Sequence, residues 1–165
     1  MKNLKENQIK AVKIFGANYE LKVIYKRIKT PKLNLTEKQI EICLPTKYKK
    51  INNDLIIGML IEKMYDAIAH KELEVIMEKV RITLKFAPED YKIERLDKRL
   101  GKVIANKLII NPEIVEYRKD IIEYVVFYEF CKLKINKTGK KFYDMLKKYM
   151  PNYENYAYEL VGEHY

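Results

Sequence analysis

The first half of the chain alternates apolar and polar residues in two short segments and then changes to a helical periodicity. Residues 19–27 are rich in Val, Ile and Tyr and alternate loosely, and residues 39–44 alternate cleanly before Pro45. Such alternation predicts half-buried strands, and proline ends a strand because it has no N–H group to donate. Residues 30–34 predict a turn between the two strands, so we expect an antiparallel pair.

A long helix is predicted after these strands. Residues 52–54 (Asn-Asn-Asp) are favourable at a helix N-terminus, and apolar side chains then recur at helical spacing to about residue 80. Gly58 lies inside this helix, where glycine costs about 1 kcal/mol relative to alanine, so we expect a close packing point there. Two points stay open: a break near His70, and whether residues 81–86 continue the helix or form a strand.

The second half of the chain predicts two further strands and three helices. The strands cover residues 91–96 and 107–110, with a basic turn at 98–101, and the helices cover residues 119–136, 142–150 and 152–162. This order of strands, helix, strands and helices is typical of the α+β class.

Composition and charge narrow the class of protein. The chain has 165 residues, of which 33 are Lys or Arg and 23 are Asp or Glu, so its formal charge is +10. This length suits one domain, which we expect to span residues 1–165. Residues 1–50 hold 13 basic and 4 acidic side chains and form a basic strand region. Such a region suits contact with a polyanion, but it is more typical of a lysine-rich soluble surface.

No segment predicts secretion or membrane insertion. The apolar runs are far shorter than the ~20 residues of a membrane span, and the first residues lack the apolar stretch of a signal peptide. Cys43 and Cys131 lie far apart with no CxxC motif, which is typical of a reducing compartment. We therefore expect a cytoplasmic protein without a membrane partner.

Several unlike motifs follow one another towards the C-terminal end. They are Asn111-Pro112-Glu113-Ile114-Val115, Ile122-Glu123-Tyr124-Val125-Val126, the segment 128–134, Phe142-Tyr143 and Met150-Pro151-Asn152-Tyr153. In this order and spacing, over residues 89–160, they resemble the YgjP-like zinc metallopeptidases, which are relatives of the SprT-like proteases. The resemblance implies a zincin-like α+β fold with a small antiparallel sheet, a long backing helix and an active-site helix.

The resemblance also implies where zinc would bind, and those positions are changed in this chain. Family members place two His one helical turn apart, a Glu base beside the first His, and a third His just after the helix. The matching positions hold Tyr128, Lys132 and Thr138, and only Glu129 keeps the family residue. A phenol and an ammonium titrate near 10 or above, so neither is a good zinc ligand at neutral pH. We therefore expect neither a zinc cofactor nor a set of metal ligands here.

Three functions follow from this comparison. The first is a non-catalytic relative of a metallopeptidase that has lost its metal site and acts as a binding or regulatory module, with a protein or a nucleic acid as partner. The second is an active metal-dependent peptidase whose site is rebuilt around Glu129, the retained general-base position. The third is a basic nucleic-acid-binding module that reuses the fold.

Tyr128, Glu129 and Lys132 form a candidate polar network in place of the metal. Lys132 follows Glu129 by three residues and is therefore its neighbour on a helix. In one arrangement the Lys132 ammonium neutralises a buried Glu129 and Tyr128 donates its hydroxyl to the same network. In the other, the groove is open and both charges are solvated.

Three further residues were weighed as metal ligands. Cys131 lies three residues after Tyr128, but a small core side chain is the better interpretation. His70 and His164 stand at no ligand spacing from a second His or Cys, which is typical of surface or packing histidines.

Basic residues supply the candidate contacts to a polyanion. They follow the first strand, the second strand and the active-site helix: Lys26, Arg27, Lys29, Lys47, Lys49, Lys50, Lys137, Lys140 and Lys141. If they converge, they form a basic rim around the former cleft.

Overall fold

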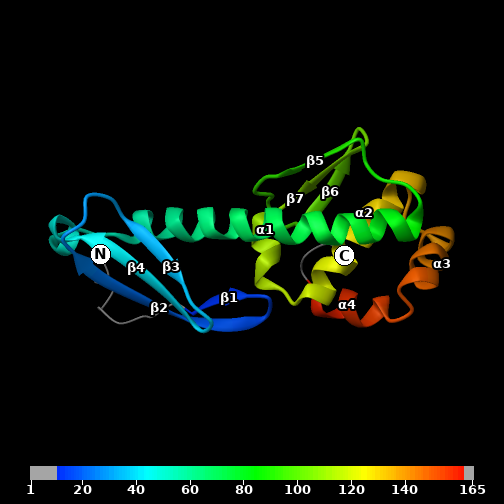
Figure 1. The fold of residues 1–165 in the computed structure, drawn as a ribbon. Coiled ribbons are helices and arrows are strands. Elements are labelled where there is room, and N and C mark those ends of the chain that lie inside the picture. Colours follow the sequence, from blue (N-terminus) through cyan, green and yellow to red (C-terminus); the bar gives the residue numbers. More distant parts are fainter. Residues whose placement is uncertain (1–10, 162–165) are drawn as a thin grey trace, which may run out of the picture. The chain divides into compact units, whose positions relative to one another are not determined.

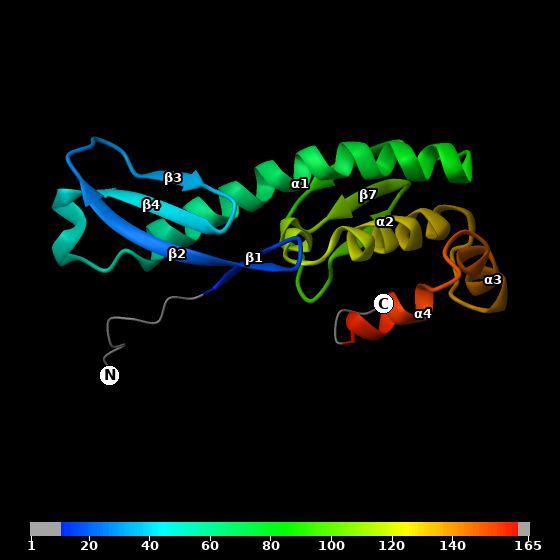
Figure 2. The ribbon, with the colours of Figure 1, turned by 60° about the horizontal axis from the view of Figure 1, so that its bottom comes forward.

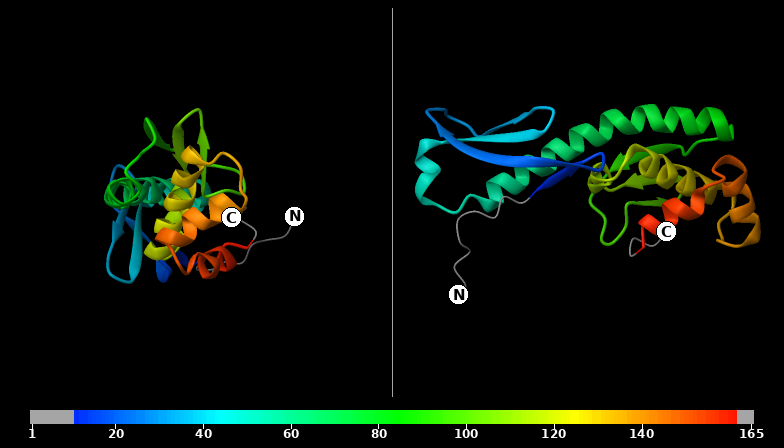
Figure 3. Two further views of the ribbon diagram at one scale, coloured as in Figure 1. Left: turned by 90° about the vertical axis from the view of Figure 1, so that its right-hand side faces the viewer. Right: turned by 90° about the horizontal axis from the view of Figure 1, so that it is seen from below.

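The computed structural model describes residues 11–161, and its contacts divide the chain into two compact units. The first unit ends at Met64 and the second begins at Tyr65. Figure 1 labels the elements in chain order, and Figure 3 shows the same ribbon from two further sides. The expectation of a single domain over residues 1–165 stays a prediction.

A four-stranded sheet forms the first unit together with the beginning of a helix. Its strands are β1 (Val12–Ile14), β2 (Ala17–Lys26), β3 (Lys32–Leu35) and β4 (Gln39–Pro45), in the order β1-β2-β4-β3. Pro45 is followed by the short 3-10 helix η1 (Thr46–Lys50). The buried face is formed mainly by β4, where Ile40, Ile42 and Leu44 are inaccessible to solvent.

The antiparallel pairing predicted for the first two strands is wrong. β2 and β4 run parallel, with Val23 opposite Ile42, and β3 pairs antiparallel with β4 on its other side. The segment expected to be only a turn contains β3, which reverses the chain and lets β4 enter beside β2 in the same direction. The alternation of residues 39–44 therefore identified a strand but carried no information about its partner.

Two tight hairpins turn through residues with positive φ. Phe15 (φ 50°) and Gly16 (φ 81°) connect β1 to β2. Ala105 (φ 47°) and Asn106 (φ 63°) connect β6 to β7 in the second unit. Positive φ at both central residues is the geometry that suits the twist of a two-residue hairpin.

Helix α1 (Asp54–Leu84) contains 31 residues and runs through the boundary between the units. At its start the Asp54 N–H donates to the side-chain oxygen of Asn52 at 2.8 Å, as expected for a cap. The helix does not break at His70 and continues to Leu84, which settles both open points. The close packing point expected at Gly58 is wrong, because an added Cβ would meet no atom within 4 Å.

A three-stranded sheet and three helices complete the second unit. The strands β5 (Asp90–Ile93), β6 (Gly101–Ile104) and β7 (Lys107–Ile110) lie in the order β5-β7-β6, with β5 and β7 parallel. After the 3-10 helix η2 (Pro112–Glu116) come α2 (Lys119–Lys134), α3 (Lys140–Tyr149) and α4 (Tyr153–Glu159). The predicted α+β class is confirmed, but the expected small antiparallel sheet is wrong, because both sheets combine parallel with antiparallel pairs.

Helix α2 is the centre of the second unit. Between Ile121 and Cys131 every side chain except Glu123 is buried, because β6, α3 and α4 all contact this helix. Two ion pairs join it to α1: Lys119 with Glu72 and Lys79 with Glu123, each at 2.7 Å. Figure 2 shows α2 lying between the sheet strand β7 and the final helix α4. These buried side chains of α2 are therefore held on several sides.

A buried asparagine closes the turn before α2. The Asn111 side chain donates to the carbonyl oxygens of Leu96 (3.0 Å) and Arg99 (3.1 Å) and accepts from the Glu113 N–H at 3.1 Å. The Asn-Pro motif of the sequence thus fixes the segment that leads into α2.

No helix in the part of the chain between residues 11 and 161 is long and apolar enough to cross a membrane.

Candidate functional site

The site that the motifs predict lies on α2, in the middle of the second unit. Tyr128 and Lys132 are four residues apart on this helix, and Glu129 lies between them. The Glu129 side chain has no exposed surface, whereas the Lys132 side chain is 26% exposed. The helix therefore presents a buried carboxylate beside a partly accessible ammonium.

Lys132 binds Glu129 directly. Its Nζ lies 3.0 Å from one carboxylate oxygen of Glu129 and 3.2 Å from the other. A buried carboxylate without a counter-charge has a large desolvation cost, and the ammonium offsets that cost. Of the two arrangements left open by the sequence, the geometry corresponds to the internal salt bridge and not to an open groove with solvated charges.

Tyr128 joins this pair through its ring. The Lys132 Nζ lies 4.7 Å from the Tyr128 ring centroid, which is within the range of a cation–π contact. Burial, together with the neighbouring Tyr143 and Glu129, raises the pKa of Tyr128 to about 12. The phenol is therefore neutral at physiological pH, in a form that binds metal poorly.

Aromatic side chains of α2 and α3 pack against Tyr128. Phe142 meets it edge to face, with centroids 4.9 Å apart, and Tyr124 lies at 6.0 Å on the preceding turn of α2. Tyr143 stacks on Tyr153 at 5.8 Å, which ties α4 to α3. Sequence reasoning missed these partners of the site. In the sequence, Phe142 and Leu146 are four residues apart, which predicts one apolar side of a helix. This spacing is the signal that could have pointed to them, and both side chains are buried in α3.

The third predicted position, Thr138, lies in the loop between α2 and α3 and is exposed. Its hydroxyl is a weak ligand, and Gly139 beside it begins α3 with an extended backbone. This loop, residues 135–139, therefore contains no strong metal donor.

The donor set does not fit zinc. Structural and catalytic zinc sites use thiolate, imidazole and carboxylate ligands. The positions implied by the motifs offer a neutral phenol, an ammonium and a hydroxyl, and Glu129 is already bound by Lys132. Among residues 11–161 no group of three or more His, Cys, Asp or Glu side chains could hold a metal ion.

The remaining candidate ligands do not alter this outcome. Burial raises the pKa of the Cys131 thiol to about 11, which is opposite to the shift of a metal-binding thiolate. His70 is exposed on α1, with its Nε2 3.9 Å from an Asp66 carboxylate oxygen. His164 lies outside the described residues.

The basic candidates fall into two groups, each within its own unit. Lys26, Arg27, Lys29, Lys47, Lys49 and Lys50 belong to the first unit, and Lys137, Lys140 and Lys141 to the second. All nine are exposed. Two of them pair with a carboxylate: Lys26 with Glu41 at 3.4 Å and Lys140 with Asp144 at 2.7 Å. The basic rim between the two groups stays a prediction.

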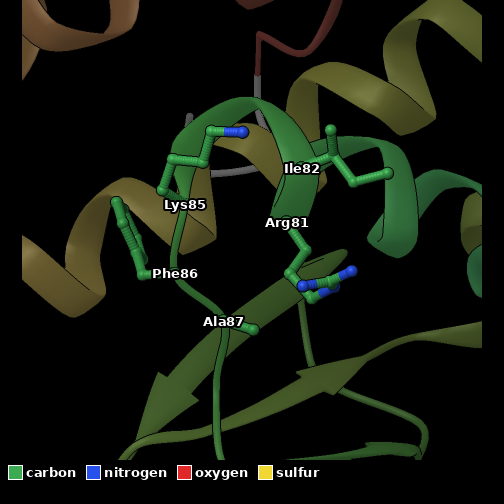
Figure 4. A pocket seen from close by; sticks show the side chains of 5 residues that line it. All are labelled: Arg81, Ile82, Lys85, Phe86 and Ala87. Atoms are coloured by element: carbon green, nitrogen blue, oxygen red, sulfur yellow. The ribbon is translucent and has the colours of Figure 1, made fainter.

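A pocket lies at the C-terminal end of α1 and was not predicted. Figure 4 shows the side chains that line it, from Arg81, Ile82, Lys85, Phe86 and Ala87. The Lys134 Nζ, at the end of α2, lies 5.0 Å from the Phe86 ring centroid. The pocket thus combines an aromatic ring with cationic side chains.

The α+β architecture, with Glu129 on its central helix, agrees with the metallopeptidase class that the motifs indicate. The family described as YgjP-like, metallopeptidase domain, matches residues 2–162, and the chain belongs to this family. The family predicted from the motifs is thereby confirmed, and with it the expectation of a zincin-like fold.

A solved structure is also similar to this chain. It is the metallopeptidase zymogen jannalysin of Methanocaldococcus jannaschii, with 17% sequence identity and a TM-score of 0.49. The similarity covers 57% of this chain and 91% of the jannalysin chain. A comparison with curated protein sequences gives no match.

Proposed function

We propose that this protein is a non-catalytic member of the YgjP-like metallopeptidase family that acts by binding a partner. The contact between Lys132 and the fully buried Glu129 carries the proposal. In the family the glutamate acts as base on water activated by zinc. Here the Lys132 ammonium is bound to the carboxylate, and the ligand positions implied by the family hold Tyr128, Lys132 and Thr138, so Glu129 has no activated water to deprotonate.

The partner is a protein or a nucleic acid, and the protein works in a reducing compartment such as the cytoplasm. Both cysteines are free and buried, which supports a location where thiols stay reduced. The burial of the aromatic cluster around Tyr128 supports a structural role for the former active-site helix, leaving the exposed surfaces for binding.

Metal content and peptidase activity test the proposal on one preparation of the full chain. The purified protein is analysed for zinc by elemental mass spectrometry after dialysis against zinc and then against buffer without metal. Cleavage of casein and of a fluorogenic peptide mixture is followed with and without a chelator. We expect zinc far below one ion per chain and no cleavage above that of a heat-denatured sample.

The Glu129→Gln variant is the matched control for activity. Stoichiometric zinc together with chelator-sensitive cleavage that disappears in Glu129→Gln would contradict the proposal. It would instead establish the second function, a peptidase rebuilt around Glu129.

A further inference from the structure

Positive charge is concentrated at one end of the second unit. Between residues 132 and 148 the chain has seven lysines and one aspartate, a net charge of +6. These residues form the end of α2, the following loop and α3. Figures 1 and 2 both show the C-terminal ends of α1 and α2 at the end of the unit where α3 lies.

Most of these ammonium groups lack a neutralising partner. Lys134, Lys137, Lys141, Lys147 and Lys148 are all exposed, and we call them the α3 basic surface. Within residues 11–161 none of the five pairs with a carboxylate, because the aspartate of this segment, Asp144, binds Lys140 instead. Uncompensated cations this dense repel one another, so an anionic partner lowers their energy.

The pocket at the end of α1 adjoins this surface. Lys134 connects the pocket to the α3 basic surface. Its Nζ lies 5.0 Å from the Phe86 ring centroid, and the loop that follows it contains Lys137 and leads into α3. Phe86 is half-buried at the pocket, and Lys85 beside it is exposed (Figure 4). An aromatic ring flanked by ammonium groups is the chemistry that receives a stacked base and its phosphates.

We propose that this end of the second unit binds single-stranded nucleic acid. The α3 basic surface contacts successive phosphates, and the Phe86 ring stacks on a base at the pocket. Lysines act as point charges without directional readout, so the binding tolerates many sequences. The inference rests on the proposed function and names its partner class, and nucleic-acid binding is measured independently of zinc content and peptide hydrolysis.

The packing of α3 argues against an anionic membrane as the partner. A helix that lies in a bilayer surface needs an exposed apolar face. The apolar side of α3 is used inside the unit, where Phe142 and Leu146 are inaccessible to solvent. The outer side carries lysines, and the exposed Tyr143 ring is stacked on Tyr153 of α4.

Fluorescence anisotropy with the full chain tests the proposal. The probe is a fluorescein-labelled single-stranded DNA of about twenty nucleotides, titrated at several salt concentrations. We expect binding at low salt whose affinity falls steeply as salt rises, since each neutralised phosphate releases counterions. Absence of binding at low salt overturns the proposal.

Two triple variants with equal charge change locate the surface. Lys134→Gln/Lys137→Gln/Lys141→Gln should weaken binding by roughly tenfold and make the salt slope shallower by about 2, from ~0.7 per lost phosphate contact. The matched control Lys29→Gln/Lys47→Gln/Lys50→Gln removes three exposed lysines of the first unit and should weaken binding by less than about threefold. Equal loss in both variants overturns the assignment of the surface.

Phe86→Leu tests the stacked base separately from the charge. We expect about fivefold weaker binding with an unchanged salt slope, because the substitution removes the π-face but no cation. Unchanged affinity contradicts the role of the pocket.

Binding to phosphatidylserine vesicles without binding to the oligonucleotide overturns the proposal in favour of a membrane. Zinc and peptidase measurements on the same preparation keep this result separate from that of the proposed function.

Discussion

At the scale of single residues, Lys132 changes what Glu129 can do. A carboxylate with no exposed surface is tolerable in the folded state only with a partner, and both of its oxygens lie within 3.2 Å of the Lys132 ammonium. The same contact places the cation 4.7 Å from the Tyr128 ring centroid. The lysine at position 132 thus neutralises the Glu129 carboxylate without a metal ion, and α2 stays packed.

We predict that Lys132→Met destabilises the protein by about 2–3 kcal/mol, because it removes the ammonium that binds both oxygens of the buried Glu129 carboxylate. The figure lies below that of a fully buried pair, since Lys132 is partly exposed and water screens the contact. Urea unfolding measures the change. The double variant Glu129→Gln/Lys132→Met removes both charges and should recover most of the loss. A double variant as unstable as Lys132→Met contradicts this account.

Tyr128 gives a prediction for alkaline pH. Burial raises its pKa from 10.0 to about 12, so between these values the unfolded chain loses the phenolic proton while the folded chain keeps it. Stability is therefore complete below pH 10 and declines as the pH rises towards 12. The unfolding free energy of Tyr128→Phe should fall less than that of the wild type between pH 9 and 11. Equal declines in the two proteins would show that Tyr128 does not contribute.

The contact between Glu129 and Lys132 could be foreseen because it is local. Residues three apart on a helix are neighbours whatever the tertiary structure. The partners of Tyr128 could not be foreseen from the sequence. Phe142 and Tyr143 belong to another helix, and nothing in the sequence gives the packing of α3 on α2. The same limit applies to Phe86 and Lys134, which are brought together from the ends of two helices.

At the scale of elements, strands and helices were predictable where the pattern is strong, and their pairing was not. The strand predicted at residues 107–110 matches β7, and the helix predicted at 119–136 differs from α2 by two residues at its end. β3 and β6 escaped prediction because β3 overlaps the segment interpreted as a turn and β6 begins at the end of the predicted basic turn. The hairpin turns at Phe15-Gly16 and Ala105-Asn106 also lack the Asn-Gly or Asp-Gly sequences that usually signal such turns.

Gly58 in α1 allows a stabilising substitution. An alanine there meets nothing within 4 Å, so it gains helix propensity without a steric cost. We predict that Gly58→Ala raises the unfolding free energy by about 0.5–1 kcal/mol, measured by urea denaturation. Ala67→Gly, at an exposed position of the same helix, is the reverse control and should lower it by a similar amount. A loss of stability in Gly58→Ala would show that the glycine has a packing role after all.

At the scale of the whole molecule, helix α1 is common to both units, and both units fall within the match to one family. Each unit has a mixed sheet of its own, yet the match to the YgjP-like family extends over residues 2–162 and so includes both. The boundary between Met64 and Tyr65 falls inside α1, which is continuous from Asp54 to Leu84. A helix is a cooperative element, so melting it in one unit removes its support from the other.

Because α1 is shared, we predict that the two units unfold together, and the two buried cysteines allow this to be measured unit by unit. Cys43 reports on the first unit and Cys131 on the second, since each thiol reacts only when its surroundings open. Pulsed thiol labelling along a urea series, read by mass spectrometry, should give one midpoint for both. Lys63→Pro breaks α1 at the boundary at a cost of ~3 kcal/mol or more and should separate the two midpoints, whereas Lys63→Ala should not. Separate midpoints in the wild type would mean that the continuous helix does not couple the units, and that the chain folds as two domains.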